Sequence, residues 1–299
     1  MTKVTVLTSL YNCEKYLKGY FYNVGKLVEK ENIEILLLHN APTDKELEIV
    51  KEYIHLYPFI RHIIIKEREG LYSSWNRGIK QADGEYLCIW NVDDVRISDS
   101  LLKQAETLDK NPGAVMTYGN YTLVSEYGDE EGILVIEPDS QQYKSIAKVS
   151  HIVGCFPMWR KFIHEKIGYF DEQFRLVADY EFQIRVALNY GLVKTDTMLG
   201  YFLQGGNERL SQNIQLQNRE RTAVELRYGI YYKMNLLYKK KAEDFKIKDV
   251  LSFGRYTPIS NYIPSYLSYI KGKKVGWFVA LFYLPLNYLR YLKNEIYGN

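Results

Sequence analysis

The stretch EYLCIWNVDD, residues 85–94, joins a nearly continuous apolar segment to two adjacent acidic residues. An apolar segment of this length is typical of a strand that is covered on both faces of a parallel sheet. In open α/β sheets, ligands bind beyond the carboxyl ends of the parallel strands. The stretch therefore predicts a buried strand, with Asp93 and Asp94 at the ligand-binding edge of the sheet.

Strand and helix patterns alternate around this stretch, through the first 120 residues. The expected strands are residues 4–8, 33–38, 62–65, 86–90 and 115–118, and the expected helices are residues 14–29, 44–56, 72–82 and 99–110. A capping box from Thr43 to Glu46 marks the start of one helix, and a Pro-Gly stop after Asn111 marks the end of another. This alternation predicts an α/β fold with a mostly parallel central sheet.

The pattern becomes mixed after residue 120, then helical and aromatic after residue 210. Further strands are expected at residues 132–136, 152–159 and 192–202, with a helix starting near Asp179 and a long helix at 215–241. The apolar segment 275–292 is interrupted by Pro285, so its continuous part is shorter than the ~20 residues that span a bilayer. Two interpretations stay open for it: a segment that lies in the membrane interface, or a helix packed on the preceding domain.

The composition narrows the class of protein. With 46% hydrophobic and 25% charged residues, the chain is ordinarily globular, and a net charge of +3 gives no indication of a nucleic-acid partner. The cysteines Cys13, Cys88 and Cys155 are far apart and lack zinc-ligand spacing, which favours reduced thiols in a cytosolic protein. No signal peptide is recognisable, so a cytoplasmic location is expected.

The acidic pair has two interpretations on its own. Adjacent carboxylates repel each other near a low-dielectric core, and a divalent cation such as Mg²⁺ or Mn²⁺ would remove that repulsion while sharing its ligands with substrate phosphates and water. The alternative is a turn or a helix cap ahead of residues 98–110, because Asp-Asp after a strand is common.

Four short motifs occur in an order that resembles family 2 of the inverting glycosyltransferases, which have a GT-A fold. They are VTVLTSLYN (4–12), EGLYSSWNRGI (69–79), ADGEY (82–86) and NVDD (91–94). The resemblance covers about residues 3–205. It implies one Rossmann-like catalytic domain at 1–210, with a nucleotide-sugar half (1–120) and an acceptor half (120–210), followed by a helical, aromatic-rich C-terminal region at 211–299.

The resemblance also implies a reaction. A sugar would pass from a nucleotide-diphosphate sugar, with a UDP-sugar as the expected donor, to a glycan or lipid-linked acceptor. Mn²⁺ or Mg²⁺ would be the cofactor, and polysaccharide assembly at the inner face of the cell membrane would be the setting, with peripheral contact through residues 275–292.

Roles are implied for individual donor-side residues. Asp93 and Asp94 correspond to ligands of the ribose and the metal, with Asp94 as the favoured metal ligand. The other implied nucleotide-sugar contacts are Thr8, Leu10, Asn40, Asn76 and Asn91. The family's second strand ends in Asp-Asp-Gly-Ser-Thr-Asp, whereas this chain has HNAPTD at 39–44. Because both carboxylates are missing there, the donor's base stays open.

A second constellation, GYFDE (168–172) followed by ADYEFQIR (178–185), resembles the family's segment that supplies the catalytic base. Asp179 is the expected base, because an acceptor hydroxyl must lose its proton as it attacks. An ordinary N-cap is the alternative for Asp179, and Glu181 is the reserve base. His151, Trp159 and Glu181 are expected in the acceptor site, although core packing also explains Trp159.

Two other classes of protein remain as alternatives. A sugar-nucleotide pyrophosphorylase would carry a Gly-rich basic loop after the first strand, whereas residues 8–13 contain neither glycine nor a basic residue. A non-catalytic relative that binds nucleotide or glycan is consistent with the carboxylates missing at 39–40, but not with the retention of Asp93, Asp94 and Asp179.

Overall fold

The computed structural model describes residues 3–139, 151–204, 213, 214, 216, 217, 220, 221 and 224. The chain divides into two compact units, Met1–Glu172 with Phe182–Asn207, and Gln173–Glu181 with Glu208–Asn299. The helix expected at 215–241 lies outside the described residues except for single helical positions between 216 and 224, and the segment 275–292 lies outside them entirely.

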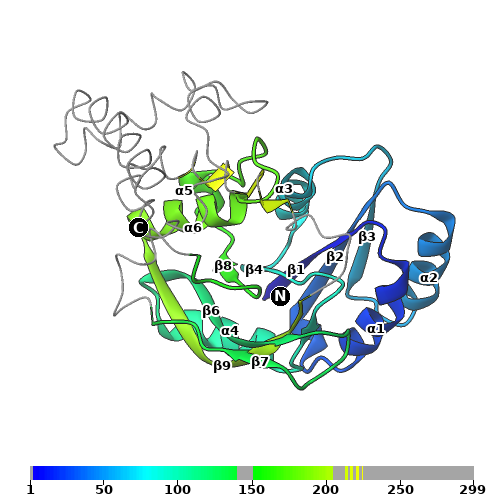
Figure 1. Cartoon of the computed structure of the whole chain (residues 1–299), viewed down its shortest axis with the longest axis horizontal. Coiled ribbons are helices and arrows are strands. Elements are labelled where there is room, and N and C mark those ends of the chain that lie inside the picture. The colour runs from blue at the N-terminus through cyan, green and yellow to red at the C-terminus, as the bar shows by residue number, and fades with distance from the viewer. Residues whose placement is uncertain are drawn as a thin grey trace, which may run out of the picture. The chain divides into compact units, whose positions relative to one another are not determined.

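The first unit is built around a nine-stranded sheet in the order β3-β2-β1-β4-β8-β6-β9-β5, with β7 paired to β6 (Figure 1). The strands are β1 (Val4–Leu10), β2 (Ile33–Asn40), β3 (Ile60–Ile65), β4 (Tyr86–Ile89), β5 (Val95–Arg96), β6 (Ala114–Val124), β7 (Ile133–Val135), β8 (Met158–Arg160) and β9 (Gly191–Leu203). The helices are α1 (Glu14–Gly25), the 3₁₀ turn η1 (Lys30–Asn32), α2 (Asp44–Ile54), α3 (Leu71–Gln81), α4 (Ser100–Lys110), α5 (Ile163–Ile167) and α6 (Ala178–Asn189).

Strands β3, β2, β1 and β4 form the parallel half that the sequence predicts. Every residue of β2 and β4 is buried, because helices cover both faces of this half. Side chains of α1, α2 and α4 pack in one core cluster with alternate residues of β1 and β2, while Gly78 of α3 faces Leu7 and Leu38 on the opposite side. The carboxyl ends of β1, β2 and β4 therefore come together at one edge.

Local signals explain several boundaries in this half. The capping box at the start of α2 is confirmed, with Thr43 and Glu46 exchanging side-chain-to-backbone hydrogen bonds. The turn between α3 and β4 needs a glycine, because a Cβ at Gly84 would lie 2.5 Å from the backbone nitrogen of Thr5. The Gly84 amide donates to Thr5 Oγ1 at 2.8 Å, so the turn that feeds β4 is fixed directly against β1.

The mixed half corrects one strand expectation. Residues 152–159 were predicted as a strand, but only β8 pairs, with β4 and β6. The amides of Ile152 and Val153 donate instead to the side-chain oxygen of Gln183, at 2.9 and 3.4 Å, and Pro157 has no N–H to offer a neighbouring strand. Residues 152–157 therefore form an irregular segment that runs into β8.

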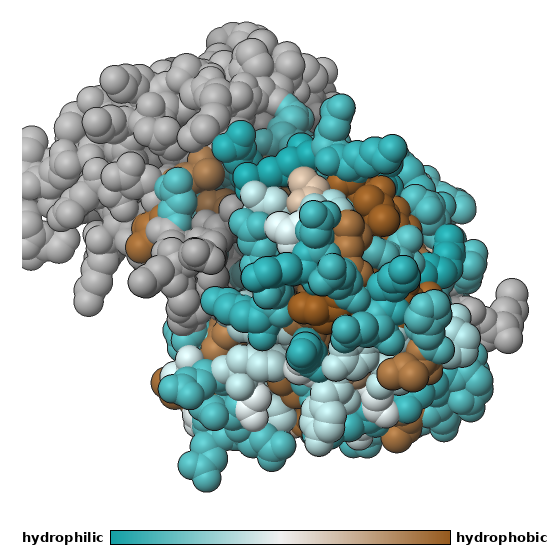
Figure 2. All heavy atoms as spheres, turned by 90° about the vertical axis from the view of Figure 1, so that its right-hand side faces the viewer, coloured by the Kyte–Doolittle hydropathy of each residue, from teal (hydrophilic) through white to brown (hydrophobic). Residues whose placement is uncertain are grey.

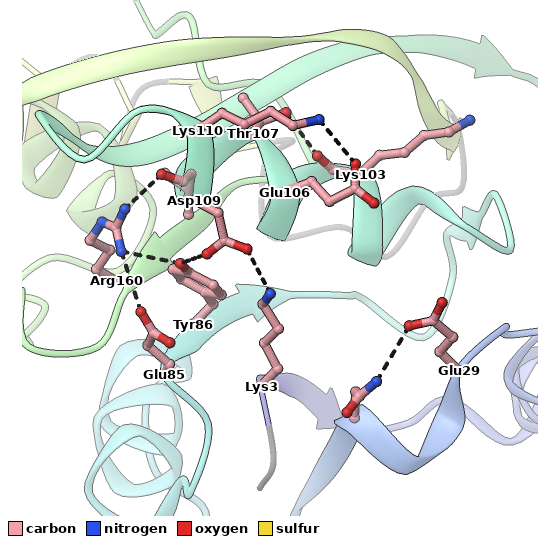
Figure 3. Close-up of polar contacts among 12 residues, drawn as sticks. Lys3, Glu29, Glu85, Tyr86, Lys103, Glu106, Thr107, Asp109, Lys110 and Arg160 are labelled. Atoms are coloured by element: carbon pink, nitrogen blue, oxygen red, sulfur yellow. Dashed lines mark hydrogen bonds and ion pairs between the residues drawn. The ribbon is translucent and has the colours of Figure 1, made fainter.

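A polar network fixes the amino end of β4 to α4, at the edge away from the acidic pair (Figure 3). The carboxylate of Asp109 accepts hydrogen bonds from Lys3 Nζ at 2.6 Å and from the Tyr86 hydroxyl at 2.5 Å. Arg160 of β8 donates to the same hydroxyl at 3.1 Å and to the carbonyl of Leu108 at 2.7 Å. The network fixes the strand that positions Asp93 and Asp94 at its other end.

Candidate functional site

The turns that follow β1 and β2 both contain a non-glycine residue in the left-handed region, Asn12 at φ 49° and Ala41 at φ 47°. Such conformations cost energy and gather at functional sites. Both turns lie at the carboxyl edge of the parallel half, where the acidic pair follows β4. The edge expected to bind ligand therefore also carries two strained turns.

The two carboxylates of the acidic turn, Asp93 and Asp94, differ in burial. Asp94 is 1% exposed, and its carboxylate accepts hydrogen bonds from the Asn91 side-chain amide at 3.1 Å and from the Leu203 backbone amide at 3.3 Å. The Asp94 carbonyl accepts from the indole of Trp90 at 2.9 Å. Asp93 is only half-buried. Asp94 thus braces the turn from inside, and Asp93 is the more accessible of the two.

A divalent cation fits this turn only with help from substrate. Among the described residues, no group of three or more His, Cys, Asp and Glu side chains is placed to hold a metal ion. A Mg²⁺ or Mn²⁺ at Asp93 would therefore take most of its oxygen ligands from a diphosphate and water, which is how these ions usually bind in nucleotide sites. The described protein ligands therefore suit a cation that is shared with a diphosphate and water, and not one held by protein side chains alone.

Two of the expected nucleotide ligands are asparagines that each bind the backbone of one distant residue. Asn40 donates from Nδ2 to the Glu69 carbonyl at 2.7 Å and accepts from the Glu69 amide at 3.0 Å. Asn76 makes the same pair of bonds with Phe170, at 2.9 and 3.0 Å. Both side chains are buried, at 7% and 3% exposure. In this arrangement the two amides hold loops at the site edge, and neither amide is presented to solvent.

We expect Asn76→Leu to lower the free energy of unfolding by about 1–3 kcal/mol, because the buried N–H and C=O of Phe170 would lose their partner. Urea unfolding followed by circular dichroism measures the change. Gln81→Leu, at the exposed end of the same helix, is the matched control and should alter stability far less. Equal stability of Asn76→Leu and wild type would contradict a bracing role for Asn76.

Three more of the expected contact residues have buried side chains. Thr8 is 0% exposed and its hydroxyl lies 2.7 Å from that of Tyr20, and Leu10 is also 0% exposed. Trp159 is 1% exposed, and its indole donates to His164 Nε2 at 2.8 Å. The Trp159 ring therefore packs in the core, which is the alternative left open by the sequence, and stacking on a sugar would require it to leave that packing.

Sequence reasoning missed three residues near this edge. Tyr11 is 38% exposed, and the Arg68 guanidinium lies 4.2 Å from the centre of its ring. Tyr127, from the β6–β7 connection, reaches α1, where its hydroxyl accepts a 3.3 Å bond from Asn23. Burial raises the pKa of Tyr127 to about 12, and the nearby carboxylates of Asp94 and Asp93 add to the rise. An exposed aromatic after β1 was a visible signal, whereas Tyr127 becomes apparent only through the fold.

The acceptor half holds a buried carboxyl that sequence reasoning also missed. Glu137, 9% exposed, shares hydrogen bonds with the phenol of Tyr121, which in turn bonds to Cys155. Burial raises the pKa of Glu137 from 4.5 to about 7, although the Tyr121 bond and the charge of Lys194 oppose the rise. His151, expected in the acceptor site, directly precedes the irregular segment that contains Cys155 and is half-buried.

The raised pKa of Glu137 predicts how stability changes with pH. The folded protein binds this proton more tightly than the unfolded chain, so the group's contribution is fully present below about pH 4.5 and is lost as pH rises through about 7. We expect Glu137→Gln, which stays neutral, to lose less stability than wild type between pH 5 and pH 8, in thermal unfolding. Glu131→Gln, at an exposed position, should follow wild type, and parallel curves for all three proteins would contradict the prediction.

The second unit contains the expected base. Asp179 is the second residue of α6, and its Oδ1 accepts from the Tyr180 amide at 2.8 Å. Glu181 is 1% exposed. Glu220 accepts from the backbone amides of Arg175 and Leu176 at 2.8 and 2.7 Å, and so fixes the segment that leads into α6.

The described surface has a hollow at a different edge of the sheet. An open cavity of about 640 Å³ is lined by residues that include Ile33, Tyr57 and Arg61. Because β2 and β3 begin there, it lies at the amino ends of the strands and away from Asp93. The side of the molecule with α2 and β3 is mainly hydrophilic, with separate hydrophobic areas (Figure 2).

No described helix is both long enough and apolar enough to cross a membrane.

Comparisons with known sequences agree with the motif order. A model of the family described as glycosyl transferase family 2 matches residues 5–168. An uncharacterized glycosyltransferase from Methanocaldococcus jannaschii is 28% identical over 191 residues, which are 62% of this chain and 65% of the relative. A candidate teichuronic acid biosynthesis glycosyltransferase from Bacillus subtilis is 24% identical over 152 residues, which are 51% of this chain and 59% of the relative. The match spans less than two thirds of either relative.

Solved structures agree with the fold. S. aureus TarS 1-349, in complex with UDP-GlcNAc, has a TM-score of 0.63 at 18% identity, covering 90% of this chain and 80% of that chain. A mannosyltransferase from Pyrobaculum calidifontis, in complex with GDP-Man and Mn²⁺, has a TM-score of 0.54 at 14% identity, covering 97% of this chain and 80% of that chain. These likenesses concern the fold alone, and they confirm the expected α/β architecture of GT-A type.

Proposed function

Because the chain belongs to glycosyl transferase family 2, we propose that it moves a sugar from a nucleotide-diphosphate sugar to a glycan or lipid-linked acceptor, with inversion at the anomeric carbon. The observation that carries the proposal is the turn after β4, which presents Asp93 at the ligand-binding edge while Asp94 braces it from inside. UDP is the first candidate for the donor's nucleotide, because a structural neighbour, TarS, is complexed with UDP-GlcNAc.

Asp93 is the residue that would hold Mn²⁺ or Mg²⁺, in place of the preference for Asp94 that the motif suggested. Asp93 is half-buried, whereas Asp94 is 1% exposed and its carboxylate accepts hydrogen bonds from Asn91 and Leu203. A bound cation would neutralise charge that develops on the departing diphosphate. The mannosyltransferase complexed with GDP-Man and Mn²⁺ supports the choice of ion.

Asp179 is the proposed general base. It would take the proton from the acceptor hydroxyl as that oxygen attacks the anomeric carbon, which is the step a poor nucleophile requires. It lies in the first turn of α6, where a carboxylate also meets the partial positive charge of the helix N-terminus. Glu181 is the reserve candidate, but its side chain is almost fully buried.

The proposed setting is polysaccharide assembly in the cytoplasm, at the inner face of the cell membrane. The name of the Bacillus subtilis relative, which refers to teichuronic acid biosynthesis, supports a surface-polymer acceptor. Peripheral membrane contact through residues 275–292 is part of this proposal, and it rests on the apolar composition of that segment alone.

A thermal-shift screen tests the donor site directly. UDP, GDP and their sugar conjugates are each added with Mn²⁺, and a ligand that binds the native state raises the melting temperature by mass action. We expect a shift for one nucleotide that disappears in excess chelator. No shift with any nucleotide diphosphate would contradict the proposal, and a shift without donor hydrolysis or transfer would favour the non-catalytic alternative.

A further inference from the structure

Arg96, in the short strand β5, is a buried cation that joins three parts of the first unit. Arg96 is only 3% exposed. One guanidinium nitrogen donates to the carbonyl of Ile89, the last residue of β4, at 3.0 Å, and another donates to Gln104 Oε1 at 2.8 Å. Both acceptors are neutral oxygens, so the cost of burying this charge is offset by hydrogen bonds to neutral groups and not by a hydrogen-bonded carboxylate.

Gln104 continues the connection into the acceptor half. This α4 residue is 0% exposed, and while its Oε1 accepts from Arg96, its Nε2 donates to the carbonyl of Phe156 at 2.8 Å. The Arg96 guanidinium also lies 5.0 Å from the centre of the Phe156 ring. A continuous chain of side-chain bonds therefore runs from the end of β4, through Arg96 and Gln104, to the irregular segment 152–157.

One end of this chain is the strand that precedes the acidic turn, and the other is the segment that follows His151, which is expected in the acceptor site. The acidic turn begins directly after Ile89, and the Asp94 carboxylate lies near enough to act electrostatically on the Arg96 guanidinium. The segment at the other end belongs to the acceptor half and follows His151. Interactions between charges are strong where water is excluded, so a buried cation beside the turn responds to any charge that is bound there.

We propose that Arg96 and Gln104 are positioning residues that couple occupation of the acidic turn to the conformation of segment 152–157. The inference rests on the proposed function, because the charge that Arg96 senses is that of a nucleotide diphosphate with its cation at Asp93. Binding there shifts the balance of charge around the guanidinium, and the bonds through Gln104 to Phe156 carry the shift to the segment that borders the acceptor. Donor binding would in this way prepare the acceptor side.

The sharpest test replaces Gln104 by Glu in the full chain. A carboxylate still accepts from Arg96 but has no N–H to donate to the Phe156 carbonyl, so the variant cuts the chain at one bond and keeps the cation paired. Gln104→Met, of similar length and without either bond, is the second variant in case the added charge prevents folding. Glu106→Gln, on the exposed side of α4 with 61% side-chain exposure, is the matched control.

Hydrogen exchange followed by mass spectrometry reports on peptides covering residues 151–160, with and without UDP or GDP plus Mn²⁺. In wild type and Glu106→Gln we expect the bound nucleotide to slow exchange in these peptides. In Gln104→Glu the same nucleotide should still bind, by calorimetry, but should leave their exchange unchanged. A structural role alone would raise exchange in both states equally and would not remove the response to nucleotide.

The outcomes separate the coupling from the proposed function. If Gln104→Glu and Gln104→Met show the same nucleotide-dependent protection of residues 151–160 as wild type, the coupling is wrong and the proposed function stands. If wild type shows no such protection although the nucleotide binds, the coupling is likewise wrong. If wild type binds neither nucleotide in the presence of Mn²⁺, the proposed function and the coupling fail together.

Discussion

Asp93→Asn is expected to reduce sugar transfer by about 10²-fold or more, equivalent to about 3 kcal/mol of transition-state stabilisation. The substitution preserves the size of the side chain and removes the charge that would hold the cation. Steady-state rates at varied Mn²⁺ measure the effect, and the variant should need more Mn²⁺ than wild type or show no response to it. Its melting temperature without ligand should fall less than that of an Asp94 variant, because Asp93 is half-buried whereas Asp94 is 1% exposed.

Asp94→Asn provides the comparison that separates the two carboxylates. Asp94 is buried and accepts hydrogen bonds from Asn91 and Leu203, so its replacement should lower thermal stability as well as activity. Asp83→Asn, whose side chain is 72% exposed, is the neutral control. Full activity of Asp93→Asn, or full activity of wild type in excess chelator, would reject a metal role for Asp93.

Asp179→Asn is expected to reduce turnover by about 10²- to 10⁴-fold, because the acceptor hydroxyl would lose its general base. The affinity for nucleotide with Mn²⁺ should change little, since the base acts on the acceptor. Turnover numbers and nucleotide binding by calorimetry, measured on the same preparation, test both statements.

Glu181→Gln distinguishes the two carboxylates of this segment. If Asp179→Asn turns over at a near-normal rate while Glu181→Gln is slow, the base is Glu181. If both variants are slow but only Glu181→Gln has a lowered melting temperature, then Glu181 is a buried structural residue and Asp179 keeps the catalytic role. Asp171→Asn, a half-buried residue in the preceding turn, serves as the control for changes of charge in this region.

The sequence predicted the parallel half well because its signals are local. The apolar strands and the Thr43 capping box each act within a few residues, and the structure shows the elements they predict. The strand expected at 152–159 was wrong for most of its length because an apolar run does not reveal where its amides bond. Those of Ile152 and Val153 bond to Gln183, about thirty positions later.

The site was harder to predict because the decisive contacts join distant parts of the chain. The motif favoured Asp94 as the metal ligand, but a bond that holds Asp94 inside the turn comes from Leu203 in β9. The burial of Arg96 between β4, α4 and the irregular segment appears only in the fold. Tyr127 reaches the vicinity of the acidic turn from a connection of the acceptor half.

Asn40 and Asn76 share one feature with a wider consequence. Each side-chain amide imitates a peptide group, pairing with both backbone groups of a single residue as a neighbouring strand would. An asparagine used in this way links two distant segments of the chain through its side chain. Its presence in a motif therefore indicates how those segments are held together. Chains that share such motif positions can therefore share an architecture while reading different nucleotides, so the base of the donor has to be sought in residues such as Tyr11 and Arg68, whose side chains face outward.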